Sequence, residues 1–305
     1  MGDDLLRGIP RFPEFRDIEL GDRASIGELF NAYPTEISER TFGSIFVWRG
    51  FQGRSRLAEL DGHLLISWYK PKFGKVLLPP VGPEPVRIVS VLNEQSGLLS
   101  ERFEGAYGIT EPVTAGLASA GYQVGSLRDE WDYVYRVQDL VGLKGPRYHT
   151  QRKELKRLTL SYDVSFDFMA EHHQKACLEL EEKWCDIKRC SFDNLSSAED
   201  AALKEALLGL DELGFVGGVA LVEGRIQALI IGEKLNSSTA VIHFEKANPE
   251  IRGLYQFINQ QFCEKALSAY EFVNREQDVG EPGLRRAKTG YHPDHFVEKS
   301  IAYLG

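Results

Sequence analysis

The sequence predicts a mixed α/β (α+β) protein built from two halves that share one plan. Apolar runs on either side of an acidic-Gly pair occur once in each half, around Asp61-Gly62 and around Glu223-Gly224. Each pair is followed by another extended run and an amphipathic helix. Each half then closes with a segment that begins Glu-Pro and ends Gly-Tyr, at residues 111–122 and 281–291. We therefore expect two copies of one domain, which arose by duplication.

A β-hairpin is predicted near the start of each copy. Residues 56–60 and 63–69 flank the first acidic-Gly pair, and residues 216–222 and 225–232 flank the second. A two-residue link of this composition between apolar runs is a strong hairpin signal.

An extended run and a helix are predicted after each hairpin. The extended runs are residues 75–81 and 239–247, and the helices are residues 85–99 and 254–267. In the second helix apolar residues recur every four positions from Leu254 to Ala266, which defines one buried face.

The closing strands, residues 131–137 and 295–304, set the domain boundaries that we expect. Residues 1–140 form the first domain and residues 141–305 the second, each a mixed and mostly antiparallel sheet flanked by helices. In the first copy the loop before the helix, residues 81–85, has two prolines that cannot donate a hydrogen bond and a carboxylate that would repel an anion, so we expect this domain not to be catalytic.

Charged and amide side chains are dense in residues 270–299, directly behind an apolar strand signal. If the strand continues through this run, Asn274, Glu276 and Asp278 leave one face while Arg275 and Gln277 leave the other. The chain is then expected to turn through Gly280, Pro282 and Gly283 into a short helix with Gly290 as its stop. This helix carries the basic residues Arg285, Arg286 and Lys288.

The order of elements and several motifs resemble a known family. The order helix, hairpin, strand, helix, strand, helix, strand is that of the GNAT-type acyltransferase fold, in tandem. The motifs are HFEKAN (243–248), GLYQFIN (253–259), VNREQDVGEPGLRRAK (273–288) and, more loosely, the junction at residues 132–158. They resemble the family of the lysylphosphatidylglycerol synthase C-terminal region and its soluble relatives.

The resemblance implies a soluble transferase that moves an activated acyl group to an amine or hydroxyl. The expected donor is aminoacyl-tRNA, and the acceptor is a small or lipid-like molecule. An acyl-CoA-dependent N-acyltransferase is the alternative, and a non-catalytic small-ligand-binding protein is a third class. An acetyl-CoA enzyme would show a Gly-rich phosphate loop, whereas residues 248–253 offer one Gly and one Arg.

Attack of an amine on an acyl carbonyl needs a proton acceptor and a group that stabilises charge on oxygen. The residues expected to take or give the proton are Glu245, Glu276, Asp278 and Tyr291. The residues expected to hold substrate are Asn274, Arg275, Gln277, Arg285 and Lys288. The alternative is that these charges form an internal ion-pair network, because buried charges are generally paired whatever their role.

Donor phosphates are expected at the start of the helix over residues 254–267, where a helix N-terminus favours an anion. The candidates are Arg252, Gly253, Tyr255 and Asn259. The alternative is that Arg252-Gly253 forms an ordinary helix start.

A basic segment joins the two halves and is a candidate RNA-binding surface. Its cations are Lys144, Arg147, Arg152, Lys153, Lys156 and Arg157, against the single acid Glu154. On a helix Arg152 and Lys156 form one row, and Lys153 and Arg157 form a second row beside it, which suits RNA phosphates or an acidic partner. The alternative is a solvated linker helix.

Composition sets further limits. The chain has 305 residues and a net charge of −9, which argues against a general nucleic-acid binder. No apolar run approaches the roughly 20 residues that span a bilayer, so we expect a cytoplasmic protein without an integral membrane segment. We expect no metal site. The four cysteines lack paired spacing and are expected to be buried thiols, and His172-His173 is expected at the surface.

Overall fold

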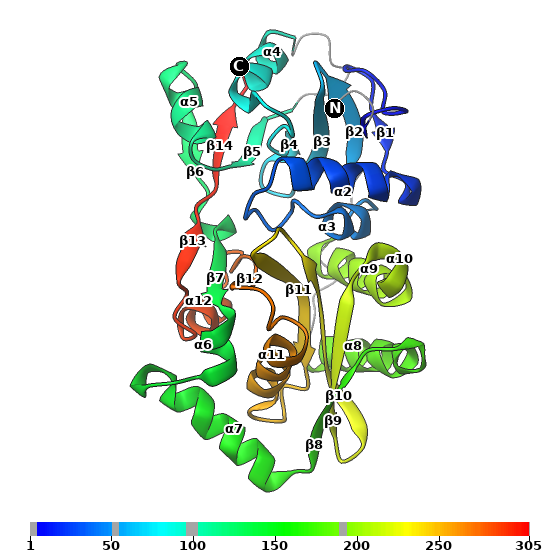
Figure 1. Ribbon diagram of the computed structural model, residues 1–305, viewed down its shortest axis with the longest axis vertical. Helices are drawn as coiled ribbons and strands as arrows, with labels where there is room; N and C mark the ends of the chain where they lie inside the picture. The colour runs from blue at the N-terminus through cyan, green and yellow to red at the C-terminus, as the bar shows by residue number, and fades with distance from the viewer. Residues whose placement is uncertain (1–4, 51–54, 96–102, 189–193, 305) are drawn as a thin grey trace. The chain divides into compact units, whose positions relative to one another are not determined.

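The computed structural model places the chain in two compact units (Figure 1). The structure describes residues 5–50, 55–95, 103–188 and 194–304. Unit 1 comprises residues 1–132, 277–280 and 297–305, and unit 2 comprises residues 133–276 and 281–296. Unit 1 thus includes residues 277–280 and 297–305 from the second half of the chain, and unit 2 includes residues 133–140 from the first half.

Unit 1 is built on a sheet whose strands lie in the order β1-β2-β3-β4-β5-β14-β6. The strands are β1 (Arg16–Asp17), β2 (Arg56–Leu60), β3 (His63–Lys70), β4 (Gly74–Leu77), β5 (Gly105–Ile109), β6 (Val124–Ser126) and β14 (Ser300–Tyr303). The helices are α2 (Arg23–Ala32), α3 (Phe42–Val47), α4 (Pro85–Glu94) and α5 (Val113–Ser119).

Unit 2 is built on a second sheet, in the order β13-β7-β12-β11-β10-β9-β8. The strands are β7 (Asp132–Arg136), β8 (Val164–Phe168), β9 (Val216–Val222), β10 (Arg225–Lys234), β11 (Thr239–Ala247), β12 (Phe272–Asn274) and β13 (His295–Val297). The helices are α6 (Val137–Gly142), α7 (His149–Ser161), α8 (Gln174–Lys188), α9 (Asn194–Leu208), α10 (Leu210–Leu213), α11 (Leu254–Lys265) and α12 (Pro282–Thr289).

Both predicted hairpins are confirmed, and their turns explain the acidic-Gly pairs. Asp61-Gly62 links β2 to β3 with φ of 48° and 75°, and Glu223-Gly224 links β9 to β10 with φ of 50° and 73°. A two-residue turn with two positive φ angles matches the twist of the flanking strands, and it favours Gly at its second position.

The shared plan extends to the parallel strand pair in each sheet, β4 with β5 and β11 with β12. Each sheet also holds one strand from the far end of the other half. Strand β7 pairs with β12 in the sheet of unit 2. Strand β14 pairs with both β5 and β6 in the sheet of unit 1. The two halves therefore exchange their closing strands.

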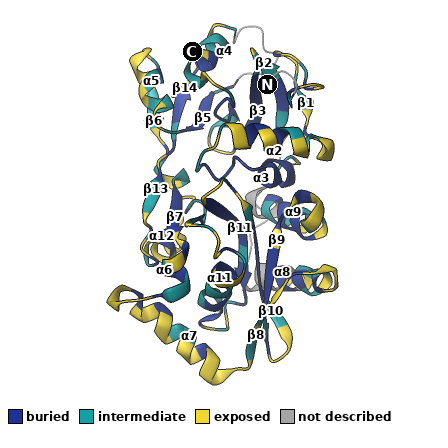
Figure 2. Ribbon diagram, viewed as in Figure 1, coloured by how far each residue is buried: buried dark blue, intermediate teal, exposed yellow. Residues whose placement is uncertain are grey.

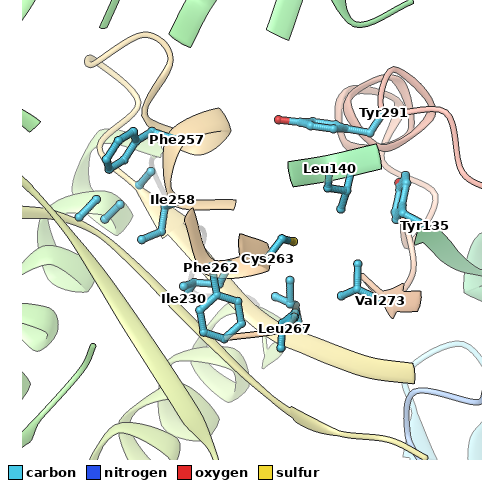
Figure 3. Packing of buried hydrophobic residues seen from close by; sticks show 14 of the residues in the cluster. Tyr135, Leu140, Ile230, Phe257, Ile258, Phe262, Cys263, Leu267, Val273 and Tyr291 are labelled. Atoms are coloured by element: carbon cyan, nitrogen blue, oxygen red, sulfur yellow. The ribbon is translucent and has the colours of Figure 1, made fainter. Parts of the chain in front are cut away.

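Helix α11 and the sheet form the core of unit 2 (Figure 3). Leu254, Phe257, Ile258 and Phe262 of α11 are buried, as the four-residue periodicity predicts. Ile230 of β10 packs in the same cluster. Burying one such side chain contributes roughly 1.5–3 kcal/mol. Figure 2 shows that α7, by contrast, keeps most of its length exposed.

Two local predictions are wrong. The strand expected to run through residue 278 ends at Asn274, because Glu276 adopts a positive φ of 56°. Residues 295–304 form two strands, β13 and β14, in different sheets. The helix expected over residues 85–99 is α4 up to Glu94, and residues 96–99 lie outside the described residues. Across the described part of the chain, no helix is both long and apolar enough to cross a bilayer.

Candidate functional site

The candidate site lies in unit 2, where strands β11 and β12 diverge. The two strands pair in parallel only from Thr239 to Val241 of β11, whereas β11 continues to Ala247. Beyond that point side chains replace the backbone ladder. His243 bonds Glu276, and Glu245 bonds Arg275. The segment after β12 is thus held to β11 by two ion pairs.

The centre of the site is the carboxylate of Glu245. A terminal nitrogen of Arg275, Nη2, donates to Oε2 of Glu245 at 2.9 Å, and Nδ2 of Asn259 on α11 donates to the same oxygen at 3.0 Å. The side chains of Arg275 and Glu245 are 11% and 13% exposed. An ion pair this buried is strong only if its remaining polar atoms are also bonded.

Two tyrosines flank the guanidinium of Arg275. Its central carbon lies 4.8 Å from the ring centre of Tyr291 and 5.6 Å from that of Tyr135. Burial raises the pKa of both phenols above the ordinary value, so both remain protonated at neutral pH. Figure 3 shows both tyrosines beside Leu140 and Val273, with the sulfur of Cys263 turned toward that side.

Lys288 of α12 supports the segment that carries Arg275. Its ammonium donates to the backbone carbonyl of Arg275, and its own carbonyl accepts from the hydroxyl of Tyr135 at 2.8 Å. Arg285 is half-buried and lies nearly one turn before Lys288 on the same helix.

Sequence reasoning missed a buried histidine beside this centre. Nδ1 of His243 lies 2.7 Å from Glu276 and Nε2 lies 2.9 Å from Glu233. Burial alone would lower the pKa of His243, but the hydrogen bonds to Glu233 and Glu276 outweigh burial and raise the pKa to about 10. The ring is therefore an imidazolium at neutral pH. No sequence signal pointed to Glu233; His243 could have been suspected from its place two residues before Glu245.

The strained backbone of Glu276 is fixed from both sides. Its N–H donates to Oδ1 of the buried Asn274, and its carbonyl accepts from the N–H of Tyr133. A non-glycine residue with positive φ persists only where its surroundings enforce it. Asn274, predicted to hold substrate, therefore fixes the backbone just after the end of β12.

Two of the predicted site residues belong to unit 1. Nε2 of Gln277 donates to Asp132 at 2.6 Å and to Ser38 at 2.8 Å. Asp278 has a fully buried side chain that pairs with Arg128 at 3.2 Å. The structure therefore brings Glu245, Asn259, Arg275, Glu276, Lys288 and Tyr291 together in unit 2, and it places Gln277 and Asp278 in the other unit.

The loop before α11 uses many of its N–H groups internally. The N–H groups of Asn248, Glu250, Ile251 and Leu254 all donate within the protein. Gly253 has a φ of 89°, and a Cβ there would lie 2.4 Å from the carbonyl oxygen of Glu154 on α7.

Helix packing alone therefore accounts for Gly253. Arg252 beside it is exposed, and Tyr255 in the first turn of α11 is half-buried. Their predicted contact with donor phosphates stays a prediction.

All six cations of the basic segment are exposed, and two of them also bond to groups within the protein. Arg152 donates to the carbonyls of Leu143 and Gly145, and Arg147 pairs with Asp139 at 2.8 Å. The remaining four, Lys144, Lys153, Lys156 and Arg157, are exposed. Because Gln151 and Leu158 are buried, Lys153, Lys156 and Arg157 share the outer side of α7.

The cysteines and histidines supply no metal centre among the described side chains. Cys177 and Cys263 are buried free thiols, as expected, and burial raises the pKa of each to about 12. The side chain of Cys185 and all of Cys190 lie outside the described part. His172 is exposed, but His173 is buried, so the surface prediction is wrong for His173.

Three solved structures resemble the chain over nearly its whole length. A conserved protein of unknown function from Bacteroides thetaiotaomicron is 29% identical, with 95% of this chain and 99% of that chain covered and a TM-score of 0.87. L-PGS from Bacillus licheniformis is 14% identical, with 98% and 94% covered and a TM-score of 0.65. A tandem GNAT protein from the clavulanic acid biosynthesis pathway is 11% identical, with 96% and 98% covered and a TM-score of 0.52.

These likenesses confirm the tandem GNAT fold that the order of elements predicts. Among curated proteins none matches the sequence. The family model described as "Phosphatidylglycerol lysyltransferase, C-terminal" matches residues 30–303. Because that match spans most of the chain, the protein belongs to the family of the phosphatidylglycerol lysyltransferase C-terminal region.

Proposed function

We propose that the protein is an aminoacyl transferase that moves an aminoacyl group from aminoacyl-tRNA to an amine or hydroxyl of a small or lipid-like acceptor. The observation that carries this proposal is the family match over residues 30–303, whose name describes transfer of a lysyl group to a phospholipid. The similar fold of L-PGS supports it.

The ionic centre of unit 2 supplies groups that suit this chemistry. Of the four residues predicted to move a proton, Glu276 has the most accessible side chain, 27% exposed, against 13% for Glu245 and 0% for Asp278. We assign Glu276 as the carboxylate that accepts the proton of the attacking amine or hydroxyl. Tyr291, held protonated by burial, is assigned to the leaving oxygen.

The donor assignment follows from the basic helix and the loop before α11. The outer side of α7 presents three cations to a polyphosphate. In residues 248–254, by contrast, four backbone N–H groups already donate to other groups of the protein. Phosphate contacts of exposed Lys and Arg provide most of the non-specific affinity for nucleic acid. Aminoacyl-tRNA is therefore the preferred donor over acyl-CoA.

Equilibrium binding of bulk aminoacylated tRNA tests the donor class, with uncharged tRNA and acetyl-CoA as competitors at several salt concentrations. We expect salt-sensitive binding that prefers the charged tRNA. The triple variant K153Q/K156Q/R157Q should weaken binding. It should also reduce the slope of log K against log[salt] by up to roughly 0.9 for each phosphate that the variant no longer neutralises.

The matched control removes three exposed cations elsewhere in unit 2, K175Q/K204Q/R225Q, and should leave the slope unchanged. Displacement of tRNA by acetyl-CoA, or binding of acetyl-CoA alone, would contradict the donor assignment and favour an acyl-CoA-dependent N-acyltransferase. Equal weakening in both triple variants would show that α7 has no special role.

A further inference from the structure

Two buried polar atoms around Glu245 have no hydrogen-bond partner. Nη1 of Arg275 and Oδ1 of Asn259 are both buried and unbonded, although the other terminal atom of each side chain binds the same oxygen of Glu245. The residue Asn259 is only 1% exposed. Leaving such a group unbonded costs about 1–3 kcal/mol, and more for a charged group. A ligand that bonds both atoms would account for their retention.

The positions of the two atoms restrict what that ligand is. The bonded atoms, Nη2 of Arg275 and Nδ2 of Asn259, lie 2.9 and 3.0 Å from Oε2 of Glu245, so the two side chains meet at the same carboxylate oxygen. One unbonded atom is a donor and the other is an acceptor. Because Glu245 already neutralises Arg275, a full negative charge on the ligand is not needed for binding. A ligand that bonds both atoms therefore needs a neutral acceptor oxygen and, close to it, an N–H donor.

We propose that Arg275 and Asn259 bind the aminoacyl group itself: Nη1 of Arg275 donates to its carbonyl oxygen, and Oδ1 of Asn259 accepts from its α-amino group. An aminoacyl ester carries these two groups on adjacent carbons. This assignment rests on the proposed function, and it changes the role of both residues. Arg275, expected only to hold substrate, serves the reacting carbonyl, and Asn259 serves the amino acid instead of the donor's phosphates.

The contact of Arg275 with the carbonyl oxygen strengthens in the transition state, whereas the contact of Asn259 with the amino group does not. The nucleophile forms a bond to the carbonyl carbon, and the π electrons of the carbonyl move onto its oxygen beside Nη1. Collapse restores the carbonyl and breaks the bond to the leaving oxygen of the tRNA, which ends with the proton that the nucleophile lost. Charge develops only on the oxygen that faces Arg275, so that contact favours the transition state. The contact of Asn259 with the amino group stays the same throughout.

Kinetics of two variants separate these roles. Arg275→Lys keeps a cation beside Glu245 but removes the second terminal nitrogen, and we expect kcat to fall about 100-fold with little change in KM. Asn259→Ala should raise KM for the aminoacyl donor about tenfold with little change in kcat, because uniform binding is lost. Arg136→Lys and Gln261→Ala are the matched controls in the same unit, and both should behave as wild type.

A purely structural role gives a different pattern. If Arg275→Lys and Asn259→Ala lower the melting temperature and reduce activity only in proportion to the folded fraction, the assignment is wrong. Equal effects of the two variants on kcat and KM would also overturn it.

A crystal structure of the full chain soaked with alaninamide tests the contacts without turnover. We expect the amide oxygen within hydrogen-bond distance of Nη1 of Arg275, and the amino nitrogen at the same distance from Oδ1 of Asn259. Bonds from both atoms to protein groups, or to a water that alaninamide does not displace, would overturn the inference. If wild type shows no transfer from aminoacyl-tRNA yet alaninamide binds in this way, the proposed function fails while the binding assignment stands.

Discussion

Each unit buries an ionic centre, and the two centres differ in how completely their polar atoms are bonded. In unit 1 the ammonium of Lys299, 0% exposed, donates to Glu39 at 2.5 Å, to Asp132 at 2.8 Å and to Ser38 at 3.4 Å. All three of its protons therefore have a partner. The oxygens of Asp132 also accept from Gln277 and from the backbone and hydroxyl of Ser38. In unit 2, Arg275 and Asn259 each leave one atom unbonded.

The difference fits a structural role for the Lys299 centre and the proposed ligand-binding role for the Glu245 centre. A buried ion pair offsets its desolvation best when its remaining polar atoms are also bonded. In the Lys299 centre the three ammonium protons and each carboxylate oxygen of Glu39 and Asp132 have a partner. Burial acts to lower the pKa of Lys299, but Asp132 and Glu39 raise it above its ordinary value, so the charge is permanent. The incomplete bonding around Glu245 is the pattern of a site that a ligand completes.

Removing the cation of the complete centre should have the largest effect. Lys299→Met leaves Glu39 and Asp132 buried without a counter-ion, and we expect a loss of about 3–5 kcal/mol in the free energy of unfolding of unit 1. Urea unfolding followed by tryptophan fluorescence measures it. Adding Glu39→Gln and Asp132→Asn to this variant should restore part of the loss, because the uncompensated charges are then gone.

Lys175→Met, at a side chain that is 90% exposed, is the control and should change little. If Lys299→Met lowers the free energy of unfolding by less than about 1 kcal/mol, the Lys299 centre contributes no more than an ordinary surface ion pair. The proposed difference between the two centres would then be wrong.

Alkaline pH should weaken unit 2 before unit 1. The folded-state pKa of His243, about 10, is above its ordinary value of 6.5, so its contribution to stability is complete below pH 6.5 and is lost as pH rises through 10. From pH 7 to 9 wild type should lose about 2 kcal/mol relative to His243→Asn. Thermal melts of both proteins across this range measure the difference. A constant difference would mean that His243 is not an imidazolium in the folded state.

A matched pair of amide substitutions should discriminate most directly between the two centres. Gln277→Met removes two bonded donors from the complete centre, and we expect a loss of about 1.5–3 kcal/mol. Asn259→Leu removes one bonded donor together with an unbonded acceptor, so the two contributions offset and the loss should stay within about 1 kcal/mol. Urea midpoints compare the two variants. Equal losses would show that the bonding around Asn259 is as complete as that around Gln277.

Local signals in the sequence were enough to predict most of the fold. Strand β11 begins and ends where its apolar run does, at residues 239–247, and both hairpins turn at their acidic-Gly pairs. Helix α11 buries the face that its periodicity marks. Each of these features depends on neighbours within a few residues, which is why the sequence reveals them.

The geometry of the site depends on an irregularity that no sequence pattern announced. Strict alternation along β11 would put Ile242 and Glu245 on opposite faces of the sheet. The register between β10 and β11 shifts at His243, since Ile231 pairs with Phe244 while Gly232 pairs with Ile242. As a result, Ile242 packs in the α11 core and Glu245 bonds Asn259 of α11. The bulge also releases His243 to bond Glu233 and Glu276.

The sequence also did not predict that residues 274–278 are divided between the two units. Alternation grouped Glu276 with Asp278 and Arg275 with Gln277, but the positive φ at Glu276 ends the regular alternation. Asp278 and Gln277 then bond Arg128 and Asp132, residues that lie far away in the sequence. Long-range pairings of this kind have no local signature. The sequence therefore identified the segment but not which of its residues belong to each unit.

The exchange of closing strands has a consequence for synthesis on the ribosome. Strand β14 lies between β5 and β6, so the first sheet has a gap until residues 300–303 have been made. Lys299, the cation of the buried centre in unit 1, is made immediately before them. We expect unit 1 to stay protease-sensitive in nascent chains stalled before residue 298 and to become resistant once residue 304 has left the exit tunnel. A polypeptide that stops before residue 300 would then expose the unpaired edges of β5 and β6.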